Sequence, residues 1–319
     1  MDLMNRPQSE REAHRVQASR DELVERMARA VREDGTVVPL GGLQLRRASS
    51  PTELGHGVSY PALCMIAQGS KEILLGDDRY RYDPAHYLIT TATLPITTRI
   101  IEASEERPYL GLVLRLETTL VGSVMVEAGH SAPRRPSDVK AIDVSPLEAS
   151  LLDATVRLVR LLDSPSAEAR FLAPLIKREI VYRLLMGEQG GRLNHIAALG
   201  GHTHRIVEAI ERFRKDFDRP LRIEDIAREL GMSVSGFHHH FRVVTAMSPL
   251  QFQKQIRLQE ARRLMLGEDF DAASAGYRVG YGDASHFTRE YKRLFGAPPA
   301  RDAERLREAA TVGATLAAY

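Results

Sequence analysis

The chain has 319 residues, of which 43% are hydrophobic and 27% charged, and its formal net charge is only +2. This length predicts two or three domains, and the composition is typical of a soluble globular protein. The chain has no apolar run near the roughly 20 residues that cross a bilayer, and its polar N-terminus does not resemble a secretory signal. The single cysteine, Cys64, excludes an internal disulfide, so we expect a cytoplasmic protein without a membrane partner.

The N-terminal part of the sequence changes from a helical to a β pattern. Residues 19–32 place Leu23, Met27 and Val31 on one face of an amphipathic helix. Between residues 36 and 120, short β-rich runs alternate with turns, and the stretch "GDDRYRYDP" is typical of a hairpin. Several short strands at this spacing predict a small β-barrel or sandwich.

A helical period begins near residue 146. Residues 145–164 and 171–188 carry wide apolar stripes and predict two helices, the first with Ser145 as its cap and Pro146 in its first turn. Such stripes must cover the β domain, each other or a second copy of the chain. Of these three partners we favour the second copy, which predicts a homodimer.

The C-terminal third contains the outline of a helix-turn-helix. A short helix ends at Gly231, which permits the left-handed backbone of a tight turn, and a second helix opens at Ser233. Phe237 and Phe241 lie on the inner side of this second helix, so its polar residues face outward.

The same outline recurs about fifty residues later, where Gly280 forms the turn and Asp283 caps a helix with an inner stripe of Phe287, Tyr291 and Phe295. Residues 248–266 predict one continuous helix between the copies, roughly 26 Å long. Two outward-facing helices at this spacing can approach successive major-groove turns, which lie about 34 Å apart. The repeated outline therefore predicts a protein that binds double-stranded DNA.

At this point the sequence resembles a known family. "MSPLQFQKQIRLQEARRLM" and "VGYGDASHFTREYKRLFGAPP" are similar to the DNA-binding domain of AraC/XylS-type bacterial transcription regulators, and the β-rich part resembles their cupin-like N-terminal domain. Ala275 and Gly276 stand where that family usually has a larger aliphatic residue and an alanine. This departure predicts looser packing beneath the second reading helix.

The resemblance implies a role for the exposed side chains of both second helices. Base reading is expected from Ser235, His238 and His239 in the first copy and from Ala284, Ser285, His286 and Arg289 in the second. Contacts with DNA phosphates are expected from Arg242, Lys254, Lys292 and Arg293.

Metal binding, catalysis and thiol sensing have weaker support in the sequence than DNA binding. The run His238–His240 cannot close on one metal ion, because consecutive helical residues point about 100° apart. A cupin-type metal enzyme with a DNA-binding tail is the alternative function, but the closely spaced histidine pair of such enzymes is missing between residues 36 and 140. Cys64 lies in an apolar run and is either a core residue or a thiol sensor of effectors.

Together these patterns predict an α+β chain with a cupin-like β-barrel or sandwich, a helical linker pair and an all-α domain with two helix-turn-helix motifs. The resemblance implies double-stranded DNA, RNA polymerase and a small-molecule effector as partners, with no cofactor and no metal. The alternative for the N-terminal half is a role in assembly alone, without a ligand. The predicted segments are a helical arm (1–35), the sensory domain (36–140), the dimerisation linker (141–200), the DNA-binding domain (201–308) and a flexible tail (309–319).

Overall fold

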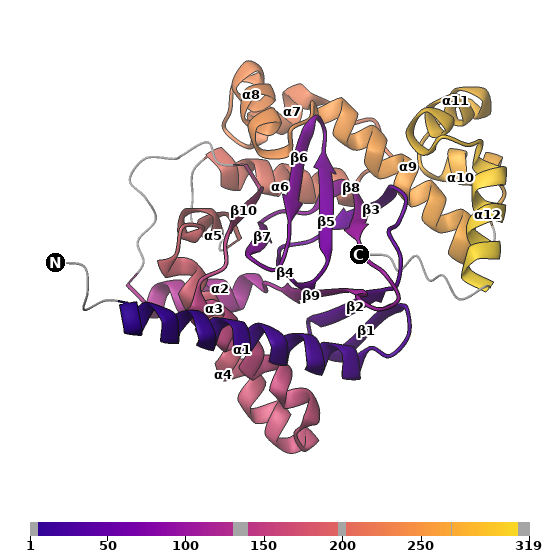
Figure 1. Cartoon of the computed structure of the whole chain (residues 1–319). Helices are drawn as coiled ribbons and strands as arrows, with labels where there is room; N and C mark the ends of the chain where they lie inside the picture. Colours follow the sequence, from indigo (N-terminus) through magenta and orange to yellow (C-terminus); the bar gives the residue numbers. More distant parts are fainter. Residues whose placement is uncertain (1–5, 130–139, 197–201, 269, 312–319) are drawn as a thin grey trace.

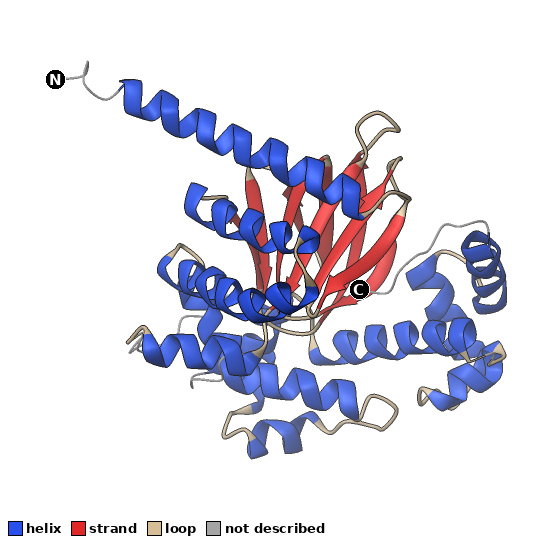
Figure 2. Cartoon of the chain, turned by 90° about the horizontal axis from the view of Figure 1, so that it is seen from below, coloured by secondary structure: helices blue, strands red, loops and turns tan. Residues whose placement is uncertain are grey.

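The computed structural model describes residues 6–129, 140–196, 202–268 and 270–311. A central β domain has helices α1–α4 on one side and the C-terminal helices on another (Figures 1 and 2). This arrangement confirms the predicted α+β class, with an N-terminal helix followed by the strands and with an all-helical C-terminal third. None of the helices in these ranges combines the length and hydropathy needed to span a membrane. Most of the predicted flexible tail, residues 312–319, lies outside the described residues.

The described strands form two sheets, and every recorded pairing is antiparallel. The larger sheet has the order β1-β2-β9-β4-β7-β10 and the smaller one β3-β8-β5-β6. The predicted hairpin is confirmed as β5–β6, in which Leu75 pairs with Asp78 around a turn at Gly76. The strands are β1 (Gly35–Leu40), β2 (Leu43–Ala48), β3 (Gly55–Ser59), β4 (Ala62–Gln68), β5 (Ser70–Leu75), β6 (Asp78–Tyr82), β7 (His86–Thr90), β8 (Leu94–Glu102), β9 (Tyr109–Arg115) and β10 (Ile142–Pro146).

The central strands of the larger sheet are buried on both faces. Along β4, Leu63 and Met65 point into a core that the sheet shares with the N-terminal helices, whereas Cys64 and Ile66 point into the space between the two sheets. Because successive strand residues alternate between faces, a strand covered on both sides is apolar throughout. This explains why "ALCMIA" has no polar alternation.

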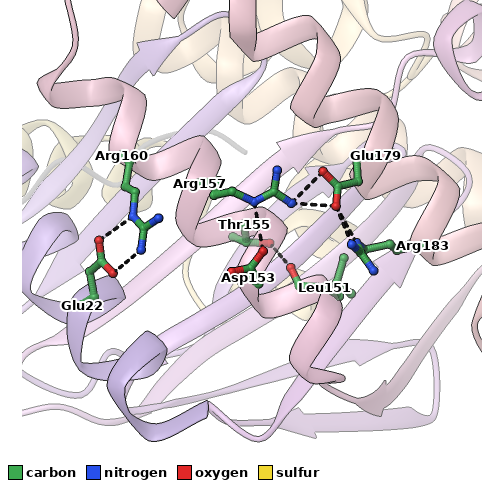
Figure 3. Close-up of polar contacts among 8 residues, drawn as sticks. All are labelled: Glu22, Leu151, Asp153, Thr155, Arg157, Arg160, Glu179 and Arg183. Atoms are coloured by element: carbon green, nitrogen blue, oxygen red, sulfur yellow. Dashed lines mark hydrogen bonds and ion pairs between the residues drawn. The ribbon is translucent and has the colours of Figure 1, made fainter. Parts of the chain in front are cut away.

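Helices α1, α3 and α4 are joined by ion pairs as well as by the apolar core (Figure 3). Glu22 of α1 accepts two hydrogen bonds from Arg160 of α3, both 2.7 Å, and this pairing lowers the pKa of Glu22 to about 2. Arg157 of α3 donates to Glu179 of α4 at 2.6 Å. The helices of this half are α1 (Arg6–Ala30), α2 (Thr118–Glu127), α3 (Ala149–Arg160), α4 (Ser166–Met186) and α5 (Gly190–Ile196).

The predicted start of the first linker helix was wrong. Ser145 and Pro146 belong to β10, which pairs with β7 from Ile142 opposite Thr90 to Pro146 opposite His86. Helix α3 begins only at Ala149. Ser145 and Pro146 fit the local pattern of a helix start, but that pattern carries no information about distant strands. The backbone of β7 pairs with these residues, so they form a strand instead.

The C-terminal helices are divided between two hydrophobic cores. The first part of α9, with Phe252 and Ile256, joins α6, α7 and α8 in a core that is continuous with the interior of the β domain. The second part of α9, with Leu258 and Met265, packs with α10, α11 and α12 in a separate core. The helices are α6 (His202–Lys215), α7 (Ile223–Glu229), α8 (Val234–Thr245), α9 (Pro249–Gly267), α10 (Ala272–Arg278), α11 (Ala284–Phe295) and α12 (Pro299–Thr311).

A fully buried carboxylate, Asp302 of α12, holds the second of these cores together. It accepts hydrogen bonds from Arg262 of α9 at 2.8 Å and from the Tyr291 hydroxyl of α11 at 2.9 Å. The guanidinium of Arg262 also lies over the ring of Phe295, 4.4 Å from its centroid. One acidic side chain therefore ties three helices together.

Replacing Asp302→Ala should lower the free energy of unfolding by about 3–5 kcal/mol, because Arg262 would remain buried without its counter-charge. Urea denaturation followed by far-UV circular dichroism measures this loss. Asp153→Ala, which removes an exposed partner of Arg157, serves as the control and should cost less than about 1 kcal/mol. Equal losses in the two variants would contradict the role given to Asp302.

Candidate nucleic-acid interface

The first candidate surface lies on α8, which packs on α7 through a tight turn. Gly231 has a φ of +63°, and the backbone N–H of Met232 donates to the carbonyl of Ala227 at 2.8 Å. Ala227 is fully buried, and its small side chain lets the two helices approach closely. Ser233 caps α8 by accepting a hydrogen bond from the backbone N–H of Gly236.

The two sides of α8 differ sharply in exposure. Phe237 and Phe241 are fully buried beneath it. The four side chains predicted to face outward are all exposed: Ser235, His238, His239 and Arg242. The outer side of α8 therefore offers hydroxyl, imidazole and guanidinium groups to a partner.

The second helix pair, α10 and α11, has the same tight turn and close helix packing, with glycine at the positions of closest contact. Gly280 has a φ of +88°, and a Cβ atom there would lie 2.1 Å from the carbonyl oxygen of Asp218. A Cβ atom on Gly276 would lie 2.9 Å from the ring of Phe287, which is fully buried. The expectation of looser packing at this position was wrong, because Phe287 lies directly against the glycine. Asp283 caps α11, as predicted.

Arg257 of α9 connects the two helix pairs through contacts between distant segments, which local sequence patterns do not predict. Its guanidinium donates to the carbonyls of Phe217 (2.5 Å) and Arg219 (2.9 Å), which lie in the loop between α6 and α7. It also donates to the carbonyl of Gly280 in the turn before α11, at 3.2 Å. Burial lowers the pKa of Arg257, and three carbonyl acceptors compensate for its lost hydration.

The outer side of α11 carries most of the residues predicted for the second copy. Those that are exposed are Ser285, His286, Arg289, Lys292 and Arg293, whereas Ala284 is half-buried. The ring of His286 contacts the edge of Tyr281, with centroids 5.6 Å apart. This contact restricts the orientation of His286 on an otherwise open surface.

Two of the predicted phosphate-binding residues share an acidic neighbour within the protein. The ammonium group of Lys254 lies 2.6 Å from Glu290 Oε2, and Arg293 lies 3.1 Å from Glu290 Oε1. Burial raises the pKa of Glu290, but the hydrogen bond and charge of Lys254 outweigh it and leave that pKa below its ordinary value. The sequence placed Lys254 and Glu290 on different helices, so it could not predict their pairing.

Helix α9 determines the separation of the two candidate surfaces. It spans 19 residues, which corresponds to about 28 Å. Figure 1 shows α8 near the start of α9, whereas α11 packs beside a later part of α9. Ser248 and Gln251 form a capping box at its start, so the helix begins at a defined residue.

A cavity of about 310 Å³ lies between the two sheets of the β domain. Strands β4, β5 and β9 contribute two lining residues each, and Cys64 of β4 is one of them. Burial raises the pKa of the Cys64 thiol to about 11, so the group is neutral at physiological pH. The thiolate that a sensor of oxidants requires is therefore disfavoured at this position.

The β domain contacts the C-terminal helices at several points. The Thr93 hydroxyl donates to Glu211 of α6 at 2.8 Å, and the backbone N–H of Ala141 donates to the carbonyl of Val244 in α8 at 3.2 Å. Farther along, Gln259 of α9 donates to the carbonyl of Gly57 at 3.0 Å. These contacts attach the β domain to both halves of the helical region.

Metal binding has no support within the described ranges, where no group of three or more His, Cys, Asp and Glu side chains could hold an ion. His238, His239 and His240 follow one another on α8, so their side chains diverge around the helix.

Two protein-family models match the sequence. "AraC-type transcriptional regulator N-terminus" matches residues 39–192, and "Helix-turn-helix domain" matches residues 226–305. Together they extend over both the β domain and the two helix pairs.

Comparison with individual known proteins leads to the same family. The chain is 25% identical to the thermoregulatory protein LcrF of Yersinia pestis, over 60% of this chain and 68% of LcrF. It is 29% identical to the transcriptional regulator ExsA of Pseudomonas aeruginosa, over 41% of this chain and 46% of ExsA, and so spans less than half of that relative. An apo structure of ToxT from Vibrio cholerae has a TM-score of 0.53 at 12% identity, covering 85% of this chain and 98% of ToxT, which is a likeness of fold. The chain thus belongs to the AraC/XylS-type family of DNA-binding transcription regulators.

Proposed function

We propose that this regulator reads double-stranded DNA with both helix pairs, α8 and α11 entering neighbouring turns of the major groove. The observation that carries the proposal is the presence of two exposed polar helix faces, on α8 and α11, whose helices pack in the two separate cores that α9 joins. That helix, about 28 Å long, approaches the 34 Å or so between successive major-groove turns.

In this proposal the exposed side chains of the two helices select the bases. Arg289 can donate two hydrogen bonds to guanine, and the serines and histidines can donate or accept at base edges. Ala284 contributes at most an apolar contact with a thymine methyl group. The base-reading set is Ser235, His238, His239, Ala284, Ser285, His286 and Arg289.

Phosphate contacts would fix the register of the protein on DNA without reading sequence. Arg242 and Lys292 are exposed, and no ion pair is recorded for either within the described part of the chain. Lys254 and Arg293 share Glu290, so for them binding a phosphate competes with an internal partner. We therefore propose stronger phosphate contacts from Arg242 and Lys292 than from Lys254 and Arg293.

We further propose that the cavity of the β domain holds a small effector. The neighbour ToxT has been solved with a bound unsaturated fatty acid, at a TM-score of 0.50 over 86% of this chain and 97% of ToxT. The ring of Tyr60, which lines the cavity here, lies 5.3 Å from the guanidinium of Arg214 on α6. Arg214 also donates to Glu211, the acceptor of the Thr93 hydroxyl. An effector that shifts Tyr60 would thereby bias α6 and the first helix pair.

We also propose a homodimer that assembles through α4. Its large exposed apolar side chains follow one another at intervals of four, seven and four residues, which places them on one stripe: Phe171, Leu175, Tyr182 and Met186. An exposed apolar stripe of this length on a helix is typical of a protein interface. A second copy with the same stripe would cover it symmetrically.

Activation of transcription through RNA polymerase is the output we propose. Relatives of this chain include the transcriptional activators VirF of Yersinia enterocolitica and RhaS of Klebsiella pneumoniae. We assign the β domain no catalytic role, because the residues described there gather no set of metal ligands for the cupin-type alternative.

Selection of bound sequences from a random duplex library should yield two conserved blocks about one helical turn apart for each protomer. Arg289→Ala should relax the preference at one base pair, with a loss of about 1–3 kcal/mol on the selected duplex and little change on random DNA. Arg32→Ala, a change to an exposed residue outside the proposed surface, is the control. A single block in the wild-type selection would refute reading by both pairs, and equal losses on both duplexes would refute the role of Arg289.

Lys292→Ala should weaken binding to all duplexes alike and reduce the slope of log K against log salt by about one. Lys254→Ala should have a smaller effect, because Glu290 already neutralises part of its charge. Fluorescence anisotropy across a salt series measures both slopes. A sequence-dependent loss in Lys292→Ala would show that this residue reads bases instead.

Phe171→Glu should convert the dimer to monomers, because it places a charge in the proposed apolar interface. Analytical ultracentrifugation measures the mass, and Arg170→Glu, one residue away and off the stripe, is the matched control. A dimer that survives Phe171→Glu and Tyr182→Glu together would rule out assembly through α4.

A further inference from the structure

A second cavity, of about 420 Å³, lies beside α1. Helix α1 supplies most of its wall, and the end of β4 and the two loops that contain Pro84 and Arg107 complete it. Ala67 of this wall belongs to the core that the larger sheet shares with the N-terminal helices, whereas the first cavity lies between the sheets. The two cavities have no lining residue in common, so they are separate sites.

Two arginines line this cavity, and neither guanidinium has a hydrogen bond or ion pair recorded among the described residues. Arg20 of α1 is half-buried, and its Nε atom is buried without a hydrogen-bond acceptor. Arg107, in the loop before β9, is exposed. A buried guanidinium nitrogen that lacks an acceptor costs free energy, and an anion in the cavity would remove that cost.

The two carboxylates of the lining are held by other donors. Asp21 accepts a hydrogen bond from the side-chain amide of Gln17 at 2.8 Å, and Glu25 accepts one from Arg29 at 2.6 Å. Within the part of the chain that the structure describes, no ion pair joins either carboxylate to the two arginines of the cavity. The charge of these arginines is therefore not neutralised by pairing across the cavity.

Asp83, which precedes Pro84 of the lining, is also bonded to other groups. Its carboxylate accepts hydrogen bonds from the backbone N–H of Ala85 and from His86 Nδ1, both at 2.8 Å. Burial raises the pKa of Asp83, but these hydrogen bonds, with a smaller contribution from the charge of Arg20, hold it below its ordinary value. Asp83 therefore senses Arg20 at a distance without forming an ion pair with it.

An anion with two negative charges suits the two arginines better than a single carboxylate. A phosphate monoester carries a charge of about −1.5 to −2 at pH 7 and has three acceptor oxygens. Each guanidinium can donate two parallel hydrogen bonds to such a group. Since Arg20 lies on a helix and Arg107 in a loop, a phosphate would bridge two segments of the chain.

The rest of the lining suits a body rich in hydroxyl groups. Asp21 and Glu25 are exposed, and an ionised carboxylate has about four acceptor sites, so each can accept further hydrogen bonds. Val24 and Pro84 add a small apolar surface, against which the C–H bonds of a sugar can pack. The volume equals about fourteen liquid-water volumes, which suits a ligand of about fourteen non-hydrogen atoms, such as a pentose phosphate.

We propose that this cavity binds a phosphorylated sugar, whose phosphate is held by Arg20 and Arg107 and whose hydroxyl groups donate to Asp21 and Glu25. The site goes beyond the proposed DNA reading and the proposed effector cavity, and it depends on neither. A ligand between α1 and β4 would attach the helix more firmly to the larger sheet and would thereby stabilise the folded chain.

Isothermal titration calorimetry on the full chain at constant ionic strength tests the site, with ribose 5-phosphate and glucose 6-phosphate as probes. Each should bind about tenfold or more tightly than its parent sugar and than inorganic phosphate. Arg20→Gln and Arg107→Gln should each weaken binding by about tenfold or more, because each removes charged hydrogen bonds. Arg15→Gln, an exposed change on α1 outside the cavity, is the matched control and should leave the affinity unchanged. Because Arg107 is exposed, Arg107→Gln keeps the test valid if Arg20→Gln fails to fold.

Three kinds of result would overturn the inference. If neither sugar phosphate binds at millimolar concentration, or if inorganic phosphate binds as tightly as they do, the cavity does not recognise a sugar phosphate. Unchanged affinity in both Arg20→Gln and Arg107→Gln would place the ligand elsewhere. Tighter binding of adenosine 5′-monophosphate, a larger molecule, than of either sugar phosphate would assign the site to nucleotides instead. The selection of duplexes is a separate measurement, so none of these results bears on the proposed DNA reading.

Discussion

Helix α9 packs into two separate hydrophobic cores, and the positions of both candidate DNA-binding faces depend on that division. Phe252 and Ile256 are buried with the first helix pair, whereas Leu258 and Met265 are buried with the second. A shift of α9 against either pair would open cavities in a close-packed interior, at a cost of about 20–25 cal/mol for each Å³. Arg257 strengthens the arrangement by binding carbonyls on both sides. The separation of α8 from α11 is therefore fixed by packing rather than by surface charge.

The two pairs are attached to the β domain in different ways. The first pair shares a continuous apolar core with the interior of the sheets, so a change in the cavity reaches it through packed side chains. The second pair, as far as the described residues extend, contacts the β domain mainly through α9 and through His56, whose ring lies 5.0 Å from that of Phe295. Burial, together with the charge of Arg262, lowers the pKa of His56 to about 4, so this contact is uncharged at neutral pH. In the proposed effector mechanism, a ligand in the cavity between the sheets acts first on α8 and reaches α11 through α9.

The two helix pairs, α7–α8 and α10–α11, achieve close helix packing and helix termination with different residues. Where Ala227 allows close helix packing in the first pair, Gly276 does so in the second and leaves room for Phe287. Helix α8 ends at Ala246 with a φ of 57°, an uncommon conformation for alanine, whereas α11 ends at Gly296 with a φ of 80°. The β5–β6 turn lies against Ala246, so the β domain supports this less favourable helix end.

The sequence predicted interactions between residues that are close in the chain, but it did not predict contacts between distant segments. The stripe of Phe287, Tyr291 and Phe295, the start of a helix at Ser233, the cap at Asp283 and the β5–β6 hairpin depend on residues a few positions apart, so their patterns predicted them correctly. The exposure of α8 and α11 followed from the same periodicity. Strand β10, the Lys254–Glu290 ion pair and the two arginines of the cavity beside α1 each require segments that are distant in the chain to meet. A local sequence pattern is compatible with many different long-range contacts. The packing of the two sheets and of α9 determines which of these contacts form.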